Sequence, residues 1–254
     1  MKGLTRQIVL ALAGPMMVYA LSFLSTNFSD FEGSGPDASG SSYYDIYATS
    51  VSPAPFTFAV WLPIFLGIIA FSIFQALPRN RDDVRLDALA LPLLAAFVLN
   101  ALTGVVSLGV SVLVIIGLLI ALVFVFGALT PFKAGKGFTW LVRVPLVMFF
   151  SWIVVATIVT ISQWLVSINW NGLGVPADLW GAVLILSAAA IGYIVIDRSA
   201  AVSFAIPLIW GFIGIVIVDP SALPVVTACV LGGGTLLWRV FSLERSKGKL
   251  AQVG

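Results

Sequence analysis

Long runs of apolar residues alternate with short polar segments along the whole chain. A helix that crosses the roughly 30 Å hydrocarbon core of a bilayer needs about 20 mostly apolar residues. Eight runs meet this length, so the pattern predicts an all-α integral membrane protein built as a bundle of eight transmembrane helices. The predicted helices span residues 7–26, 56–77, 88–106, 109–129, 140–166, 178–196, 200–218 and 221–241.

Two boundaries between neighbouring helices, and the retention of the first helix, do not follow from run length alone. The third and fourth runs are separated only by residues 107–109, and we split them because together they would be too long for one tilted helix. The last two runs part at Asp219-Pro220, where proline cannot continue a helix. The first run follows Lys2 and Arg6 like a signal peptide, but its apolar stretch is long and no A-x-A cleavage pattern follows, so we expect it to be retained.

Composition places lipid around most of the chain. Of its 254 residues, 60% are hydrophobic and 9% charged, whereas a soluble domain carries about 25% charged residues. The chain has no histidine and one cysteine, Cys229, which excludes a Ser-His-Asp triad and removes the commonest metal ligand. We therefore expect no enzyme activity, no metal site and no cofactor. The net charge of +2 gives no support for nucleic-acid binding.

The charged residues divide between the two sides that eight helices create. One side holds all 13 basic residues, and the other holds acids alone. The basic residues are Lys2, Arg6, Arg79, Arg81, Arg85, Lys133, Lys136, Arg143, Arg198, Arg239, Arg245, Lys247 and Lys249. The acids of the other side are Asp30, Glu32, Asp37, Asp45, Asp178 and Asp219. The positive-inside rule then predicts cytoplasmic termini, in what we expect is the inner membrane of a bacterium, with lipids as partners of the basic tail.

The membrane interior contains few polar groups. The absence of ionisable side chains near the centre of any predicted helix argues against a proton pump. Asn100 and Gln163 must find hydrogen bonds there, either between helices or to a ligand. Trp61 and Trp152 also lie inside, either as ordinary packing or as walls of a cavity for a flat aromatic ligand.

The longest segment outside the membrane is residues 27–55, with the turn-rich stretch GSGPDASGSS and a group of three tyrosines, Tyr43, Tyr44 and Tyr47. It is either a surface loop or a lid over the end of the bundle.

Three groups of residues, each near or within a different helix, resemble the motifs of one family. The first group is Pro53, Pro55, Phe58, Val60, Trp61 and Gly67. The second is Leu99-Asn100, and the third is Trp152, Ala156 and Thr157. They are similar to the proline- and tryptophan-rich start of the second helix, the L-N pair and the W-x-x-x-A-T spacing of the TspO/MBR family, the tryptophan-rich sensory or translocator proteins. This chain departs from the family at Pro63-Ile64-Phe65, where the family has Leu-Tyr, at Thr103, where it has Trp, and at Met148-Phe149, where it has Pro-Tyr.

The resemblance covers about residues 1–166 and implies a five-helix TspO-like domain, followed in residues 167–254 by three additional helices and a basic tail. Family members bind porphyrins and other tetrapyrroles and often form homodimers. By resemblance, Trp61, Asn100 and Trp152 would line a ligand cavity, and Phe58, Pro53 and Pro55 would shape its mouth.

The sequence therefore predicts a membrane binding or sensory protein with a cavity for an apolar or flat amphipathic ligand, which the family resemblance implies is a tetrapyrrole. A small secondary transporter of a neutral or amphipathic solute is one alternative, although the two halves of the chain show no convincing repeat. A structural or assembly subunit is another. It would fit the small residues of the last three helices, where Gly232-Gly233-Gly234 predicts a close contact or a kink.

Overall fold

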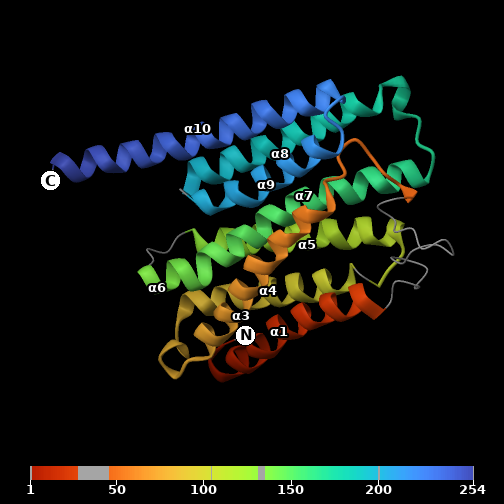
Figure 1. The fold of residues 1–254 in the computed structure, drawn as a ribbon. Coiled ribbons are helices and arrows are strands. Elements are labelled where there is room, and N and C mark those ends of the chain that lie inside the picture. Colours follow the sequence, from red (N-terminus) through yellow and green to blue (C-terminus); the bar gives the residue numbers. More distant parts are fainter. Residues whose placement is uncertain (1, 28–45, 104, 131–134, 200, 254) are drawn as a thin grey trace.

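The computed structural model describes residues 2–27, 46–103, 105–130, 135–199 and 201–253, and helices account for most of them (Figure 1). Each of the eight predicted spans corresponds to one main helix. These are α1 (Gly3–Asn27), α3 (Trp61–Ala76), α4 (Val84–Leu102), α5 (Leu108–Leu129), α7 (Val144–Ser167), α8 (Ala177–Ser199), α9 (Ala205–Val218) and α10 (Leu223–Val253). Short helical turns extend or join them: η1 (Pro55–Val60), η2 (Pro78–Asn80), α6 (Lys136–Phe138), η3 (Thr139–Arg143), η4 (Gly172–Gly174) and η5 (Val202–Phe204).

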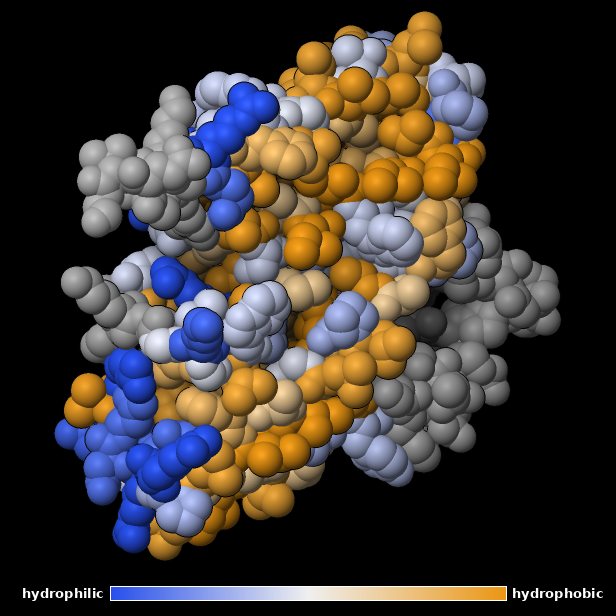
Figure 2. Space-filling model, turned by 60° about the vertical axis from the view of Figure 1, so that its left-hand side comes forward, coloured by the Kyte–Doolittle hydropathy of each residue, from blue (hydrophilic) through white to orange (hydrophobic). Residues whose placement is uncertain are grey.

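The bundle exposes apolar side chains as a membrane protein does. Among the described residues, six helical segments are long and apolar enough to cross a membrane, and the segment Val202–Val218 is a shorter apolar one. Large side chains such as Leu113 and Phe124 are 71% and 65% exposed, which water would not favour but lipid does. Figure 2 shows hydrophobic side chains over much of one face and hydrophilic ones gathered along one side. The predicted all-α membrane bundle is therefore confirmed.

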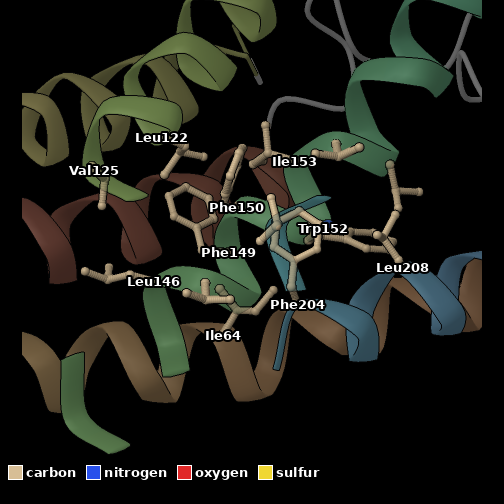
Figure 3. Close-up of a cluster of buried hydrophobic side chains, with 14 of the residues drawn as sticks. Ile64, Leu122, Val125, Leu146, Phe149, Phe150, Trp152, Ile153, Phe204 and Leu208 are labelled. Atoms are coloured by element: carbon tan, nitrogen blue, oxygen red, sulfur yellow. The ribbon is translucent and has the colours of Figure 1, made fainter. Parts of the chain in front are cut away.

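Helix α7 lies at the centre of the bundle, between two groups of helices (Figure 1). On one side it packs against α3 and α5, which in turn contact α1 and α4. On the other side it packs against α9, which lies with α8 and α10 in a second layer. Figure 3 shows Phe149 and Trp152 of α7 within the buried apolar core, together with Leu208 of α9. The last three helices thus cover a face of the central helix.

Basic side chains hold several helix ends together at one end of the bundle. Arg6 is fully buried, pairs with Asp87 at 2.5 Å, and donates hydrogen bonds to the main-chain oxygens of Asn80, Arg81 and Asp83. These bonds join the start of α1 to the start of α4. Asp197 of α8 pairs with Arg239 of α10 at 2.6 Å.

Arg143 donates to the main-chain oxygen of Ser199 at 3.5 Å, which brings the start of α7 to the end of α8. Arg6, Arg143 and Arg239 therefore lie at the same end of the bundle, as the charge pattern predicts. We refer to it as the basic end.

Small residues allow helices to approach closely. A Cβ atom on Gly67 of α3 would lie 2.6 Å from Pro145 of α7, and one on Gly232 of α10 would lie 2.8 Å from Ala189 of α8. Gly232 thus makes the close contact predicted for the glycine triplet, whereas Gly234 faces open space. Between helices in lipid, such contacts replace the hydrophobic effect as the source of packing energy.

Candidate functional site

The candidate site is built around the proline-containing segment that precedes α3, which we define as the proline segment, residues 46–60. Pro55 occupies the first turn of η1. Its fixed φ angle suits a helix there, and its missing N–H costs no hydrogen bond within the helix. Pro63 falls in the first turn of α3, where the backbone N–H groups have no partner within the helix. The prolines therefore start two successive helical turns without breaking either one.

The proline segment is fixed to α9. The main-chain N–H of Ala54 donates to the oxygen of Gly214 at 3.1 Å. The indole N–H of Trp210 donates to the main-chain oxygen of Thr57 at 2.9 Å. Gly214 has no side chain, and a Cβ atom there would overlap the methyl group of Thr57. The segment that carries much of the family resemblance therefore rests on a helix beyond residue 166.

Aromatic rings from three elements converge beside this segment, and we define Phe58, Trp61, Phe65, Phe149 and Trp152 as the aromatic cluster. The centroid of the Trp152 ring lies 5.9 Å from that of Phe58 and 6.3 Å from that of Trp61, and both contacts are edge to face. Trp61 stacks on Phe65 at 4.9 Å and lies 6.1 Å from Phe149. Such ring pairs each add about 0.5–1.5 kcal/mol beyond burial.

Members of the aromatic cluster differ in exposure. Trp152 is only 2% exposed, Trp61 is half-buried, and Phe58 is 36% exposed. The structure therefore brings three of the predicted site residues together, with Trp152 as the buried centre. Phe58 and Trp61 present part of their surface to the outside of the chain.

The other predicted site residues lie elsewhere or play a backbone role. Asn100 on α4 is 2% exposed, and its amide nitrogen donates to the sulfur of Met17 on α1 at 3.3 Å. This bond joins two helices, which is one of the two roles expected for a buried polar group. Pro53 is buried beside Gly214, and Pro55 is exposed at the start of η1.

Gln163 on α7 is buried, and its side-chain nitrogen has no hydrogen-bond partner among the described residues. Sequence reasoning overlooked two other buried amides, Gln7 and Gln75. Each donates to the main-chain oxygen of the other residue, at 3.1 Å from Gln7 and 3.0 Å from Gln75, and so ties α1 to α3.

An apolar groove of about 580 Å³ lies on the proline segment where it meets α7, α9 and α10. Among its lining residues are Ala59, Val60, Pro63, Met148, Ile209 and Trp210. The Trp210 N–H already binds Thr57, so the indole offers the groove an apolar ring. We refer to this feature as the apolar groove.

Sequence reasoning missed the apolar groove because more than half of its wall comes from α9 and α10. Their small-residue stretches predicted packing, and no motif in them pointed to a ligand.

Within the described residues, no group of three or more His, Cys, Asp or Glu side chains could hold a metal ion. Two carboxyl groups outside the membrane-spanning segments have a lowered pKa. Hydrogen bonds from Arg85 lower the pKa of Asp83, and hydrogen bonds from Ser221 lower the pKa of Asp219. Neither residue lines the apolar groove.

The tyrosine group and the GSGPDASGSS stretch fall in residues 28–45, apart from Tyr47, so the choice between loop and lid lies outside the described residues.

Comparison with known proteins gives one family. The sequence model of the TSPO-like protein family matches residues 10–242. The match includes α8 and α9 and most of α10, and so runs beyond the first five helices. A search of curated proteins and a search of solved structures found no significant match. The predicted division into a five-helix domain and three additional helices at residue 166 stays a prediction.

Proposed function

The chain belongs to the TSPO-like protein family, and from this premise we propose that it binds an apolar or flat amphipathic ligand within the membrane, as a binding or sensory protein. The apolar groove carries this proposal. Its volume lies within the roughly 300–1,000 Å³ typical of ligand pockets, and its wall includes Val60 of the resemblance motif together with Ala59 and Pro63. A tetrapyrrole is the ligand that the resemblance favours.

The chemistry of the apolar groove suits a flat hydrophobic body. Its wall combines aliphatic side chains such as Met148 and Ile209 with the ring of Trp210. Trp210 is held by its bond to Thr57 and by an edge-to-face contact with Phe56 at 5.5 Å. A wall whose rings are already fixed loses little side-chain entropy when a ligand binds.

The aromatic cluster supports the edge of the apolar groove. Trp152 on α7 contacts Phe58 and Trp61, which flank the groove residues Ala59 and Val60 in sequence. We assign Trp152 as a positioning residue for the proline segment. Phe58 and Trp61 would contact the parts of the ligand that extend beyond the groove, and Pro53 and Pro55 would fix the path of the backbone. Asn100 would act more remotely, through the α1–α4 contact.

Orientation follows from the basic end. We propose that it faces the cytoplasm, because basic loops are retained there, and that the membrane is a bacterial inner membrane. We propose that the protein has three partners: membrane lipids, the hydrophobic small molecule and, from the family resemblance, a second copy of the chain. The proposal involves no catalysis and no nucleic acid.

A titration with protoporphyrin IX tests the proposed function. The purified protein in lipid nanodiscs should bind the porphyrin saturably, seen by tryptophan quenching and by a shift of the Soret band. Trp61→Leu should weaken binding about threefold to tenfold, since an aromatic contact contributes about 0.5–1.5 kcal/mol. The matched control is Trp140→Leu, because Trp140 is 68% exposed and lies in the π-helical turn at the basic end. Absence of saturable binding to the unmodified protein would reject the porphyrin as ligand.

A further inference from the structure

A second cavity lies at the end of the bundle opposite the basic end. Its volume is about 450 Å³, and residues 48–51, the end of α7 and the start of α8 form its wall. We refer to it as the Trp170–Trp180 cavity. Its polar and aromatic lining residues include Ser50, Ser162, Trp170, Asp178 and Trp180. It shares no lining residue with the apolar groove.

Two indole rings form one side of the Trp170–Trp180 cavity. Their centroids are 5.4 Å apart, and the ring planes meet at 55°. The N–H of Trp180 donates to the main-chain oxygen of Gly172 at 2.9 Å, which fixes that ring. The faces of indole rings carry partial negative charge and attract cations within about 6 Å of the ring centre.

Asp178 is the ionisable side chain in the wall of this cavity. It is partly buried in the first turn of α8 and forms no ion pair or side-chain hydrogen bond with the described residues. Arg6, Arg143 and Arg239 lie at the opposite end, and the other described acid near this end, Asp219, lies in the turn between α9 and α10. A carboxylate without a cationic partner among the described residues therefore lies in the same cavity wall as two indole rings.

The rest of the wall is largely apolar. Leu165 and Val166 of α7 and Leu184 of α8 line the cavity together with Ile161. An aliphatic wall of this kind can contact the hydrocarbon part of a ligand. It cannot replace the water molecules that a small inorganic ion would lose on entering the cavity. The combination of one carboxylate, two indoles and an aliphatic wall matches a bulky cation.

We propose that the Trp170–Trp180 cavity binds an organic ammonium cation. The positive nitrogen would lie against the indole faces near Asp178, and its alkyl groups would contact Leu165 and Leu184. Such a group is found both on free solutes and on the head groups of phosphatidylcholine lipids. The inference is independent of the proposed function, because it concerns a different cavity and a different ligand chemistry.

Binding of radiolabelled tetrabutylammonium to the full chain tests this inference. The protein is placed in nanodiscs of phosphatidylglycerol alone, with empty nanodiscs as the blank for lipid partitioning. Saturable binding is expected, and it should weaken about tenfold or more in Asp178→Asn and in Trp170→Leu, given the strength of cation–π contacts in partly desolvated sites. Circular dichroism and the thermal midpoint of each variant show whether it is folded. Asp178→Asn is nearly isosteric and keeps the test valid if Trp170→Leu unfolds.

Asp219→Asn is the matched control, because it removes the same charge from the same end without touching the cavity wall. It should leave binding unchanged. The inference is overturned if tetrabutylammonium shows no saturable binding, if Asp178→Asn binds it like the unmodified protein, or if Asp219→Asn weakens binding as much as Asp178→Asn does.

The affinity for tetrabutylammonium in a second lipid composition shows whether the ammonium group belongs to a lipid head group or to a free solute. Two nanodiscs are compared that hold the same fraction of phosphatidylglycerol, with either an uncharged glycolipid or phosphatidylcholine as the remaining lipid, so that their surface charge is equal. A head-group site would show a lower apparent affinity for tetrabutylammonium in the second, because the lipid competes. A site for a free solute would show the same affinity in both lipids. Either result supports an ammonium site and assigns its ligand.

Discussion

Gly214 of α9 lies directly against Thr57 of the proline segment, so closely that a Cβ atom on residue 214 would overlap the Thr57 methyl group. Through this contact, a helix from the last third of the chain sets the position of the segment that begins α3. One side of the apolar groove depends on the same contact, because it is formed by residues 59, 60 and 63, which come shortly after Thr57 in the chain.

Gly214→Ala should therefore displace the proline segment from α9. Overpacking of a close contact costs about 1–3 kcal/mol, and we expect the free energy of unfolding to fall by that amount. Unfolding in mixed micelles with increasing sodium dodecyl sulfate, followed by circular dichroism, measures the change. Gly234→Ala is the control, since a Cβ atom there meets open space and alanine favours the helix. Equal stability of the Gly214→Ala protein and the unmodified one would show that the contact does not hold the segment.

Loss of the buried ion pair at the basic end should be costly. Arg6→Gln leaves Asp87 and three main-chain oxygens without their cationic partner, and breaking such a pair typically costs about 3–5 kcal/mol. Arg85→Gln is the comparison. Its pair with Asp83 is partly exposed, with 30% of the Arg85 side chain accessible, and should contribute at most about 1 kcal/mol. Similar unfolding free energies for the two variants would contradict the structural role assigned to Arg6.

Acid should remove the contribution of Asp83 to stability. Hydrogen bonds from Arg85 lower the pKa of Asp83 from its usual value of 3.8, so the folded state favours the ionised carboxylate. This contribution is fully present above pH 3.8 and is lost as the pH falls through the lower pKa of the folded state. Thermal unfolding between pH 2 and about pH 6 should show a smaller decline in Asp83→Asn than in the unmodified protein. An identical decline in both proteins would assign the acid sensitivity to other groups.

Much of the architecture follows from the sequence because the membrane imposes simple rules. Run length located the helices, and the one-sided placement of bases predicted the end at which Arg6, Arg143 and Arg239 gather. The aromatic cluster is predicted in part as well, because the sequence places both Trp61 and Trp152 inside the bundle, where they contact each other.

The position of the apolar groove could not be read in this way. It depends on α9 meeting the proline segment, a contact between residues 153 positions apart, through the indole N–H of Trp210 and the main chain of Thr57. Helix pairing in lipid depends on small residues such as Gly214, and the chain contains 23 glycines with no local signal to distinguish this one. The Trp170–Trp180 cavity has no signal in the sequence for a related reason, because tryptophans near helix ends are expected at the membrane interface in any case.

The most direct test of the central claim is protoporphyrin IX binding to Ala59→Phe. Ala59 is exposed and lines the apolar groove, so a phenyl ring at this position should fill the groove without disturbing the fold. Ala88→Phe on α4 is the matched control, at an exposed position outside the groove. We expect Ala59→Phe to weaken porphyrin binding at least about tenfold, the effect of about 1.4 kcal/mol, and Ala88→Phe to leave it unchanged. Unaltered affinity in a folded Ala59→Phe protein, with affinity lost in Trp61→Leu, would place the ligand at the aromatic cluster and contradict the groove.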